Sequence, residues 1–217
     1  EQQMAVSSLS RMTVPLASDQ SASTQGVLMP KLKYRFRVLF ENFGAANNAA
    51  PVTELTKQVI DFTRPSVDFA QIDIPIYNST IKMAGKHTWA DVTCNLRDDA
   101  GANVQKLVGE QLQKQLDFME MASASAGIDY KFITKFEVLD GGNGAVEPIV
   151  LESWELYGCY LKSVNYGDAN YGSSEAMTVA MTITFDNANQ ITGGGVGTAG
   201  TLVGRAGDVA TGVTTGL

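Results

Sequence analysis

The most constraining stretch of this sequence runs from Ala176 to Phe185 and alternates between two kinds of residue. Successive side chains of a β-strand point to opposite faces of a sheet, so a period of two predicts a strand. We expect the apolar face, Met177 to Phe185, to lie in the core. The opposite face carries only small or hydroxylated side chains, at Thr178, Ala180, Thr182 and Thr184.

This Ala/Thr face is unusual for a strand that faces water, which usually carries Lys or Glu. A neutral and compact face suits close packing against another surface. It equally suits lining a space whose contents should not be held. The residue pattern leaves both interpretations open.

Alternation elsewhere predicts further strands, so we expect a mainly β chain with some helix. The predicted strands are Lys31–Phe40, Val67–Ile76, Thr88–Leu96, Ile128–Asp140 and Trp154–Leu161. We expect Val67–Ile76 and Thr88–Leu96 to form a long hairpin that turns at Gly85. One helix is predicted at about 103–121, because apolar residues there recur at three- and four-residue spacing.

Composition divides the chain into three segments. Residues 1–30 are small and polar and are expected to form an extended arm, and residues 188–217 are expected to form a Gly-rich tail. The domain between them, 31–187, is long enough to bury a core without disulfide bonds.

The balance of charge argues against a general affinity for nucleic acid. The formal net charge is -7 and the pI is about 4.7, so the chain repels a phosphate backbone on average. No apolar run approaches the ~18 residues of a membrane span, so we expect no membrane insertion. No secretion signal is visible at the N-terminus.

The strand 31–40 departs from this acidic character. Its polar face carries the cations Lys31, Lys33, Arg35 and Arg37. Such a row could be the solvated face of an edge strand, since Lys rows block edge-to-edge pairing. It could instead meet an acidic protein surface or a phosphate backbone.

Residues capable of catalysis are few. Asp98 and Asp99 could form a carboxylate dyad or bind Mg²⁺, but their place before the predicted helix favours capping of its first turn. His87 is the only histidine, and Cys94 and Cys159 lie singly in strand-like runs, which predicts buried thiols. We therefore expect no catalytic, metal or cofactor site.

Several short motifs follow one another in a fixed order along the chain. They are Phe36-Arg37-Val38, Arg64-Pro65-Ser66, the hairpin arm Ile74–Asn78, Thr88-Trp89 leading into Arg97–Asp99, Trp154–Tyr160 and Thr182–Asn187. In this order they resemble the tail tube proteins of contractile-tailed bacteriophages. The resemblance covers about 31–187 and includes neither terminal segment.

The resemblance implies a non-enzymatic structural protein of a virion tail, assembled in the host cytoplasm. Family members are antiparallel β-sandwich-like or partial-barrel folds with a flanking helix. Six subunits form a ring, and strands of neighbouring subunits join into a continuous inner β-barrel. Stacked rings make a hollow tube inside a contractile sheath, between a baseplate and a tail terminator, and double-stranded DNA passes through without specific binding.

Under this interpretation the Ala/Thr face is expected to line the bore. The cations of strand 31–40 are expected to face another subunit or ring. The loop after that strand is the candidate for ring stacking, through Ala45, Asn47, Asn48 and Ala50.

Two alternatives remain open from the sequence. The chain could be a tube subunit of a contractile secretion or bacteriocin particle that carries no DNA. It could instead be an enzyme or a nucleic-acid-binding domain that uses Asp98 and Asp99 or the strand Lys31–Arg37.

Overall fold

The computed structural model describes residues 30–44, 52–141 and 148–191. It divides the chain into a unit that ends at Arg35 and a unit that begins at Phe36. In the first unit, Lys33 and Tyr34 form a turn that is closed by the Arg35 N–H donating to Leu32 O at 3.2 Å.

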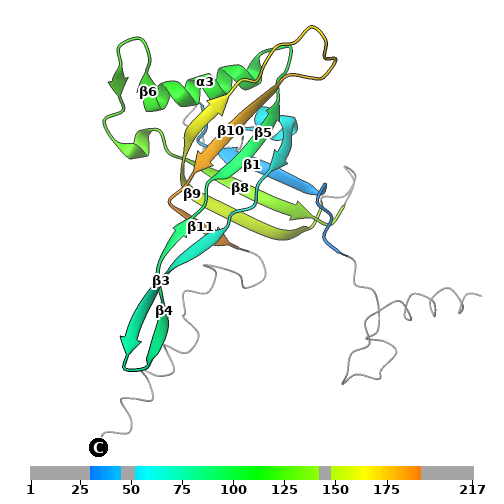
Figure 1. The fold of residues 1–217 in the computed structure, drawn as a ribbon. Helices are drawn as coiled ribbons and strands as arrows, with labels where there is room; N and C mark the ends of the chain where they lie inside the picture. Colours follow the sequence, from blue (N-terminus) through cyan, green and yellow to red (C-terminus); the bar gives the residue numbers. More distant parts are fainter. Residues whose placement is uncertain (1–29, 45–51, 142–147, 192–217) are drawn as a thin grey trace, which may run out of the picture. The chain divides into compact units, whose positions relative to one another are not determined.

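The second unit is a mainly antiparallel β fold (Figure 1). Its elements in chain order are β1 (Phe36–Glu41), α2 (Thr53–Gln58), β2 (Val59–Phe62), β3 (Val67–Ile76), β4 (Ser79–Trp89), β5 (Val92–Arg97), α3 (Asn103–Gln115), β6 (Leu116–Asp117), β7 (Ala122–Ser123), η1 (Gly127–Asp129), β8 (Phe132–Leu139), β9 (Val150–Asn165), β10 (Thr178–Thr184) and β11 (Asn187–Gln190).

Seven of the strands form one sheet in the order β1-β8-β9-β10-β5-β2, with β11 also paired to β9. The first half of β9 pairs with β8 and β11, and its second half pairs with β10. Among the described residues, β1 and β2 lie at the two ends of this order and do not pair with each other, so the sheet is open in the single chain. The predicted mainly β class with a flanking helix is confirmed.

The long strand β9 can serve both halves of the sheet because it is interrupted by a bulge near Gly158. The register with β8 shifts between Phe132 and Thr134, and Gly158 has φ +67°. A Cβ at this position would come within 2.2 Å of the Asp186 carboxylate, so only glycine fits. Asp186 is itself held above the bulge by an ion pair with Lys131.

The first strand is shorter than predicted. Alternation begins at Lys31, but β1 begins at Phe36, which pairs with Val138 near the end of β8. A ladder cannot extend past the end of its partner strand, so residues 31–35 are not part of the sheet despite their pattern.

The helix α3 packs one face on the core through Val104, Val108 and the fully buried Gln111. It begins at Asn103 as expected but ends at Gln115 rather than near 121. Asp117 accepts the backbone N–H of Met119 at 2.9 Å, which closes a turn, and β6 and β7 then form a small hairpin. Met119, which lies within the predicted helix, is 91% exposed.

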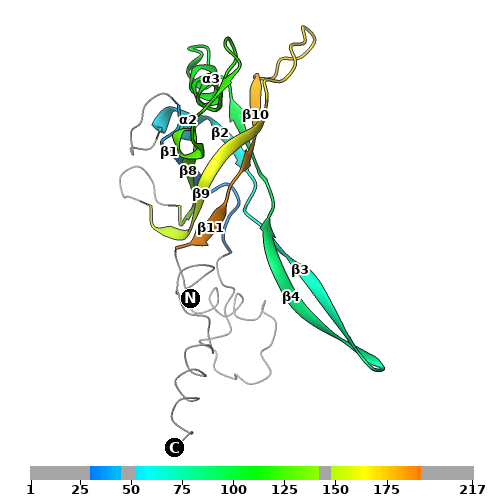
Figure 2. The same ribbon diagram turned by 90° about the vertical axis from the view of Figure 1, so that its left-hand side faces the viewer.

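The strands β3 and β4 form a hairpin that extends beyond the sheet, and we call Val67–Trp89 the arm (Figures 1 and 2). Its turn is Tyr77–Asn78, because Ile76 pairs with Ser79, so the turn predicted at Gly85 is wrong. Gly85 lies instead at the register shift in the middle of the arm, where a Cβ would meet Ala70 O at 2.9 Å.

Candidate assembly interface

One face of the half-sheet β2-β5-β10-β9 packs on the core and the other is open. Val92, Cys94 and Leu96 of β5 are buried, whereas Thr93 and Arg97 at the alternate positions are exposed and Asn95 is half-buried. Directly paired residues of antiparallel strands share a face, so the register extends this open face across the half-sheet. Its members are Asp61, Thr63, Asp91, Thr93, Asn95, Arg97, Tyr160, Ser163, Asn165, Thr178, Ala180, Thr182 and Thr184, and Lys162 reaches Asp91 from the β9 bulge.

The predicted lining residues therefore lie together on the open face. Thr178 is exposed, and Ala180, Thr182 and Thr184 are half-buried by their neighbours on the same face. No helix covers them in the described chain. On the core side Val179, Met181 and Ile183 are buried as expected, but Met177 is 51% exposed because it precedes β10.

The polar groups of the open face largely satisfy one another. Asn95 donates from Nδ2 to both carboxylate oxygens of Asp61, at 2.9 and 3.0 Å. The hydroxyls of Thr63 and Thr93 lie 2.6 Å apart. Side chains that already hold a partner have less to gain from binding a passing molecule.

The carboxylate of Asp91 on this face is also paired. Asp91 accepts from Lys162 Nζ at 2.5 Å and from Thr184 Oγ1 at 2.7 Å. These contacts with Lys162 and then Thr184 hold the pKa of Asp91 below its ordinary value, and the carboxylate raises the pKa of Lys162 in turn. The carboxylates Asp61 and Asp91 are balanced by the cations Arg97 and Lys162, so the face is nearly neutral.

Only the residues that β10 contributes to this face were predicted from the sequence. Thr93, Asn95 and Arg97 alternate with buried apolar residues in β5, and this pattern could have identified them. Asp61, Ser163 and Asn165 have no such signal, because only the register places them beside β5 and β10.

Two strand edges flank the open face. Among the described residues, β2 pairs only with β5, and the second half of β9 pairs only with β10. The helix α3 covers part of the β9 edge: Gln115 donates to Leu161 O at 3.0 Å and accepts from Leu161 N at 2.9 Å. Unpaired strand edges are templates for pairing with another chain.

The arm exposes an apolar face along its outer half. Ile72 pairs with Met83 and Ile74 with Ile81, so these side chains and Ile76 share one face. Each of them is 40–53% exposed. A two-stranded ribbon is at best marginally stable in water, so this face indicates a surface that another chain covers.

The base of the arm is anchored to the sheet. Arg64 in the predicted Arg64-Pro65-Ser66 step pairs with Glu152 of β9, which is 3% exposed and also accepts from Trp154 Nε1 at 2.7 Å. Trp89 at the end of β4 contacts Phe185, with ring centroids 5.6 Å apart. These contacts fix the direction in which the arm leaves the sheet.

The predicted row of cations is not a strand face. Lys31, Lys33 and Arg35 precede β1, and Lys31 and Lys33 are exposed. Arg37 lies in β1 and pairs with Glu137 across the β1–β8 ladder. The predicted stacking residues Ala45, Asn47, Asn48 and Ala50 lie outside the described residues.

The residues weighed for catalysis have structural roles. Asp99 accepts the Val104 N–H at 3.1 Å and Asn103 Nδ2 at 2.8 Å, which confirms the capping interpretation. The bond from Val104 is the main reason that the pKa of Asp99 is lowered. Asp98 accepts from Gln105 Nε2 at 2.6 Å.

The predicted burial of both thiols is confirmed. Cys94 and Cys159 are free and buried, and burial raises the pKa of Cys94 and raises that of Cys159 to about 11. His87 lies exposed on the arm beside Phe69.

The described residues contain neither a metal site nor a membrane-spanning helix. No cluster of His, Cys, Asp and Glu there could hold a metal ion. In the same ranges, every helix is too short or too polar to span a membrane.

Sequence comparisons leave the family open, because no family model and no curated protein matches the chain. Solved structures do match. A chain of the sheath/tube terminator structure of the extracellular contractile injection system PVC has a TM-score of 0.55 and 13% identity, covering 76% of this chain and 99% of that one. The fold is tail-tube-like.

Two further structures agree. The tube terminating cap of the anti-feeding prophage gives a TM-score of 0.53 with 18% identity, covering 82% of this chain and 98% of that one. A chain of the extended PVC sheath-tube complex gives 0.51 with 15% identity, covering 79% and 98%. The three alignments show that the chain shares its fold with these chains.

Proposed function

We propose that this chain is the structural subunit of a hollow tube within a contractile particle. Hexameric rings stack into the tube, and β2 of one copy joins the second half of β9 of its neighbour, so that the half-sheets close into one inner barrel. Closure removes the unpaired edges that the single chain exposes. The arm carries this proposal, because its apolar face has nothing to cover it in the described chain.

The open face then lines the bore. Its short, mutually hydrogen-bonded side chains and balanced charges offer no row of cations to a phosphate backbone, which is what DNA binding would need. This suits a phage tail through which double-stranded DNA passes during genome ejection. It also suits a secretion or bacteriocin particle without DNA, which is the alternative.

The remaining partners follow from the same assembly. The tube would be surrounded by a sheath and bounded by a baseplate and a tail terminator. We place the protein in the virion tail, assembled in the host cytoplasm, with a structural rather than an enzymatic role. The cations Lys31, Lys33, Arg35 and Arg37 and the loop residues Ala45, Asn47, Asn48 and Ala50 are proposed contacts to a neighbouring subunit or ring.

Electron microscopy of the purified chain tests the assembly. We expect long hollow rods from the wild type. We expect Ile74→Asp combined with Ile81→Asp to leave a folded chain without rods, because the two carboxylates stand on the apolar face of the arm. Far-ultraviolet circular dichroism checks the fold.

The matched control places the same charges on the opposite face. Gln71 and Ala84 are also directly paired on the arm, so Gln71→Asp with Ala84→Asp should preserve rods. Rods from the Ile74/Ile81 variant, or a wild type that stays monomeric at high concentration, would refute the proposal. Single rings without rods would indicate a tube-terminating role, and a salt-sensitive DNA complex of the monomer would favour a nucleic-acid-binding domain.

A further inference from the structure

The loop that joins β9 to β10, residues 166–177, lies at the opposite end of the half-sheet from the arm. Thr178 at the start of β10 pairs with Arg97, the last residue of β5, whereas Ile183 pairs with Val92 at the start of β5, next to the arm. Figures 1 and 2 show the arm and this loop leaving the strands in opposite directions. An arm therefore cannot reach the loop of its own chain.

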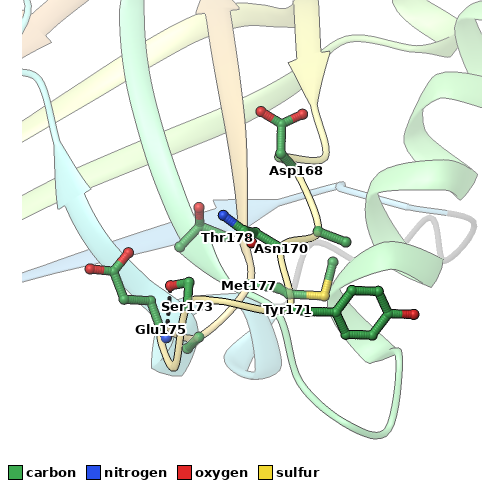
Figure 3. A pocket seen from close by; sticks show the side chains of 10 residues that line it. Asp168, Asn170, Tyr171, Ser173, Glu175, Met177 and Thr178 are labelled. Carbon is green, nitrogen blue, oxygen red and sulfur yellow. Dashed lines mark hydrogen bonds between the residues drawn. The ribbon is translucent and has the colours of Figure 1, made fainter.

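The residues of this loop line an open hollow of about 460 Å³ (Figure 3). Its shape is held by local hydrogen bonds: Gly167 N–H donates to Asn165 Oδ1 and Gly172 N–H to Asn170 Oδ1, both at 2.9 Å. Glu175 N–H donates to Ser173 Oγ at 3.2 Å. A loop fixed by its own side chains is preformed, so a ligand would not have to order it.

The lining of the hollow combines apolar and acidic groups. Tyr171 is fully exposed and Met177 is 51% exposed, although both are large and apolar. Asp168 and Glu175 are its acidic residues, and neither makes an ion pair within the described ranges. Such a site suits an aromatic group that arrives with a cation beside it.

The arm presents an aromatic tip with a cation further along its length. Tyr77 is 100% exposed and has φ +44°, as the first residue of the two-residue turn between Ile76 and Ser79. Lys82 on the return strand is exposed, lies directly opposite Asp73, and makes no ion pair within the part of the chain that the structure describes.

We propose that the arm tip of one copy docks into the 166–177 hollow of the next copy along the tube. Tyr77 enters beside Tyr171 and Met177, and Lys82 faces Asp168 and Glu175. Because donor and acceptor sites lie at opposite ends of the same strands, the contact is head-to-tail and repeats without closing, as a filament requires. The inference rests on the proposed tube function and identifies the contact that joins its rings.

Cysteine cross-linking of the full chain tests the contact. A chain carrying both Asn78→Cys and Ser173→Cys should, when oxidised as rods, give a ladder of covalent oligomers on a non-reducing gel. Each single variant should give none, since Cys94 and Cys159 are buried. Rods without a ladder would overturn this inference alone, whereas the absence of rods from the wild type would overturn the proposed function as well.

Charge exchange gives an independent readout. Lys82→Glu and Glu175→Lys should each raise the concentration needed for rods by a few-fold, about what one exposed ion pair contributes, and the double variant should regain the wild-type value. Tyr77→Ala should raise it by roughly tenfold, as the loss of a central aromatic anchor does. Rods that form at the wild-type concentration with Tyr77→Ala would contradict the inference.

Discussion

At the scale of single residues, Gln111 shows how a buried polar group fixes the helix on the core. Its side chain is 0% exposed, accepts from Gly44 N at 3.1 Å and donates to Tyr130 O at 2.6 Å. Gln111→Leu keeps the volume but leaves both backbone groups without a partner. For each of these backbone groups that water does not reach, we expect the free energy of unfolding to fall by about 1–3 kcal/mol, as measured by urea unfolding.

Gln113 provides the control for this substitution, because it lies on the exposed side of the same helix. Gln113→Leu should change the free energy of unfolding by less than about 0.5 kcal/mol, as surface substitutions usually do. Equal losses from the two variants would show that Gln111 contributes nothing through its buried hydrogen bonds.

Asp99 makes the start of the same helix sensitive to acid. Its pKa in the folded chain lies below the ordinary 3.8, chiefly because it accepts the Val104 N–H. A carboxylate whose pKa is lower in the folded chain than in the unfolded chain stabilises the fold fully at pH values above its unfolded pKa. This contribution is lost as the pH falls through its folded pKa. Between about pH 4 and pH 2 the wild type should therefore lose more stability than Asp99→Asn.

Urea unfolding of both proteins at pH 6 and pH 2.5 measures that difference. Asn keeps an acceptor for the Val104 N–H but carries no charge, so the variant should be less stable than the wild type at pH 6 and the gap should narrow in acid. A gap that stays constant with pH would show that the cap does not depend on the ionised carboxylate.

At the scale of elements, local alternation predicted which side of a strand faces the core but could not predict where a ladder ends. Thr178 to Thr184 and the β5 residues lie on the faces that their period indicates, because burial of one face is a property of the strand itself. Lys31 to Arg35 continue the same period but are not part of the sheet. The partner strand β8 ends at Leu139, just beyond the residue that pairs with Phe36.

The arm shows the same limit for turns. Gly85 and Asn78 are both turn-forming residues in one apolar stretch, and the sequence does not say which one reverses the chain. Pairing decides it, since only a turn at Tyr77–Asn78 places Ile74 opposite Ile81 and Ile72 opposite Met83. The sequence contains each isoleucine but does not give the cross-strand pairs, so the apolar face that both strands of the arm form together could not be predicted.

At the scale of the whole molecule, the open face is a candidate lining only if copies close around it. Ser163 lies directly opposite Thr182 on this face and is exposed in the single chain. In rods, Ser163→Cys should react with a small maleimide that diffuses along the bore. A maleimide on a large polymer should not reach it, because the closed wall leaves only the ends of the rod open.

Lys106 on α3 provides the outer reference, since its side chain is 73% exposed and the helix flanks the sheet. Lys106→Cys should react with both reagents in rods and in monomers, whereas Ser163→Cys should react with both reagents only as a monomer. Equal labelling of Ser163→Cys by the polymer in rods and monomers would place the open face on the outside. The lining of the bore would then have to come from other residues, and the small side chains of β10 would need another explanation.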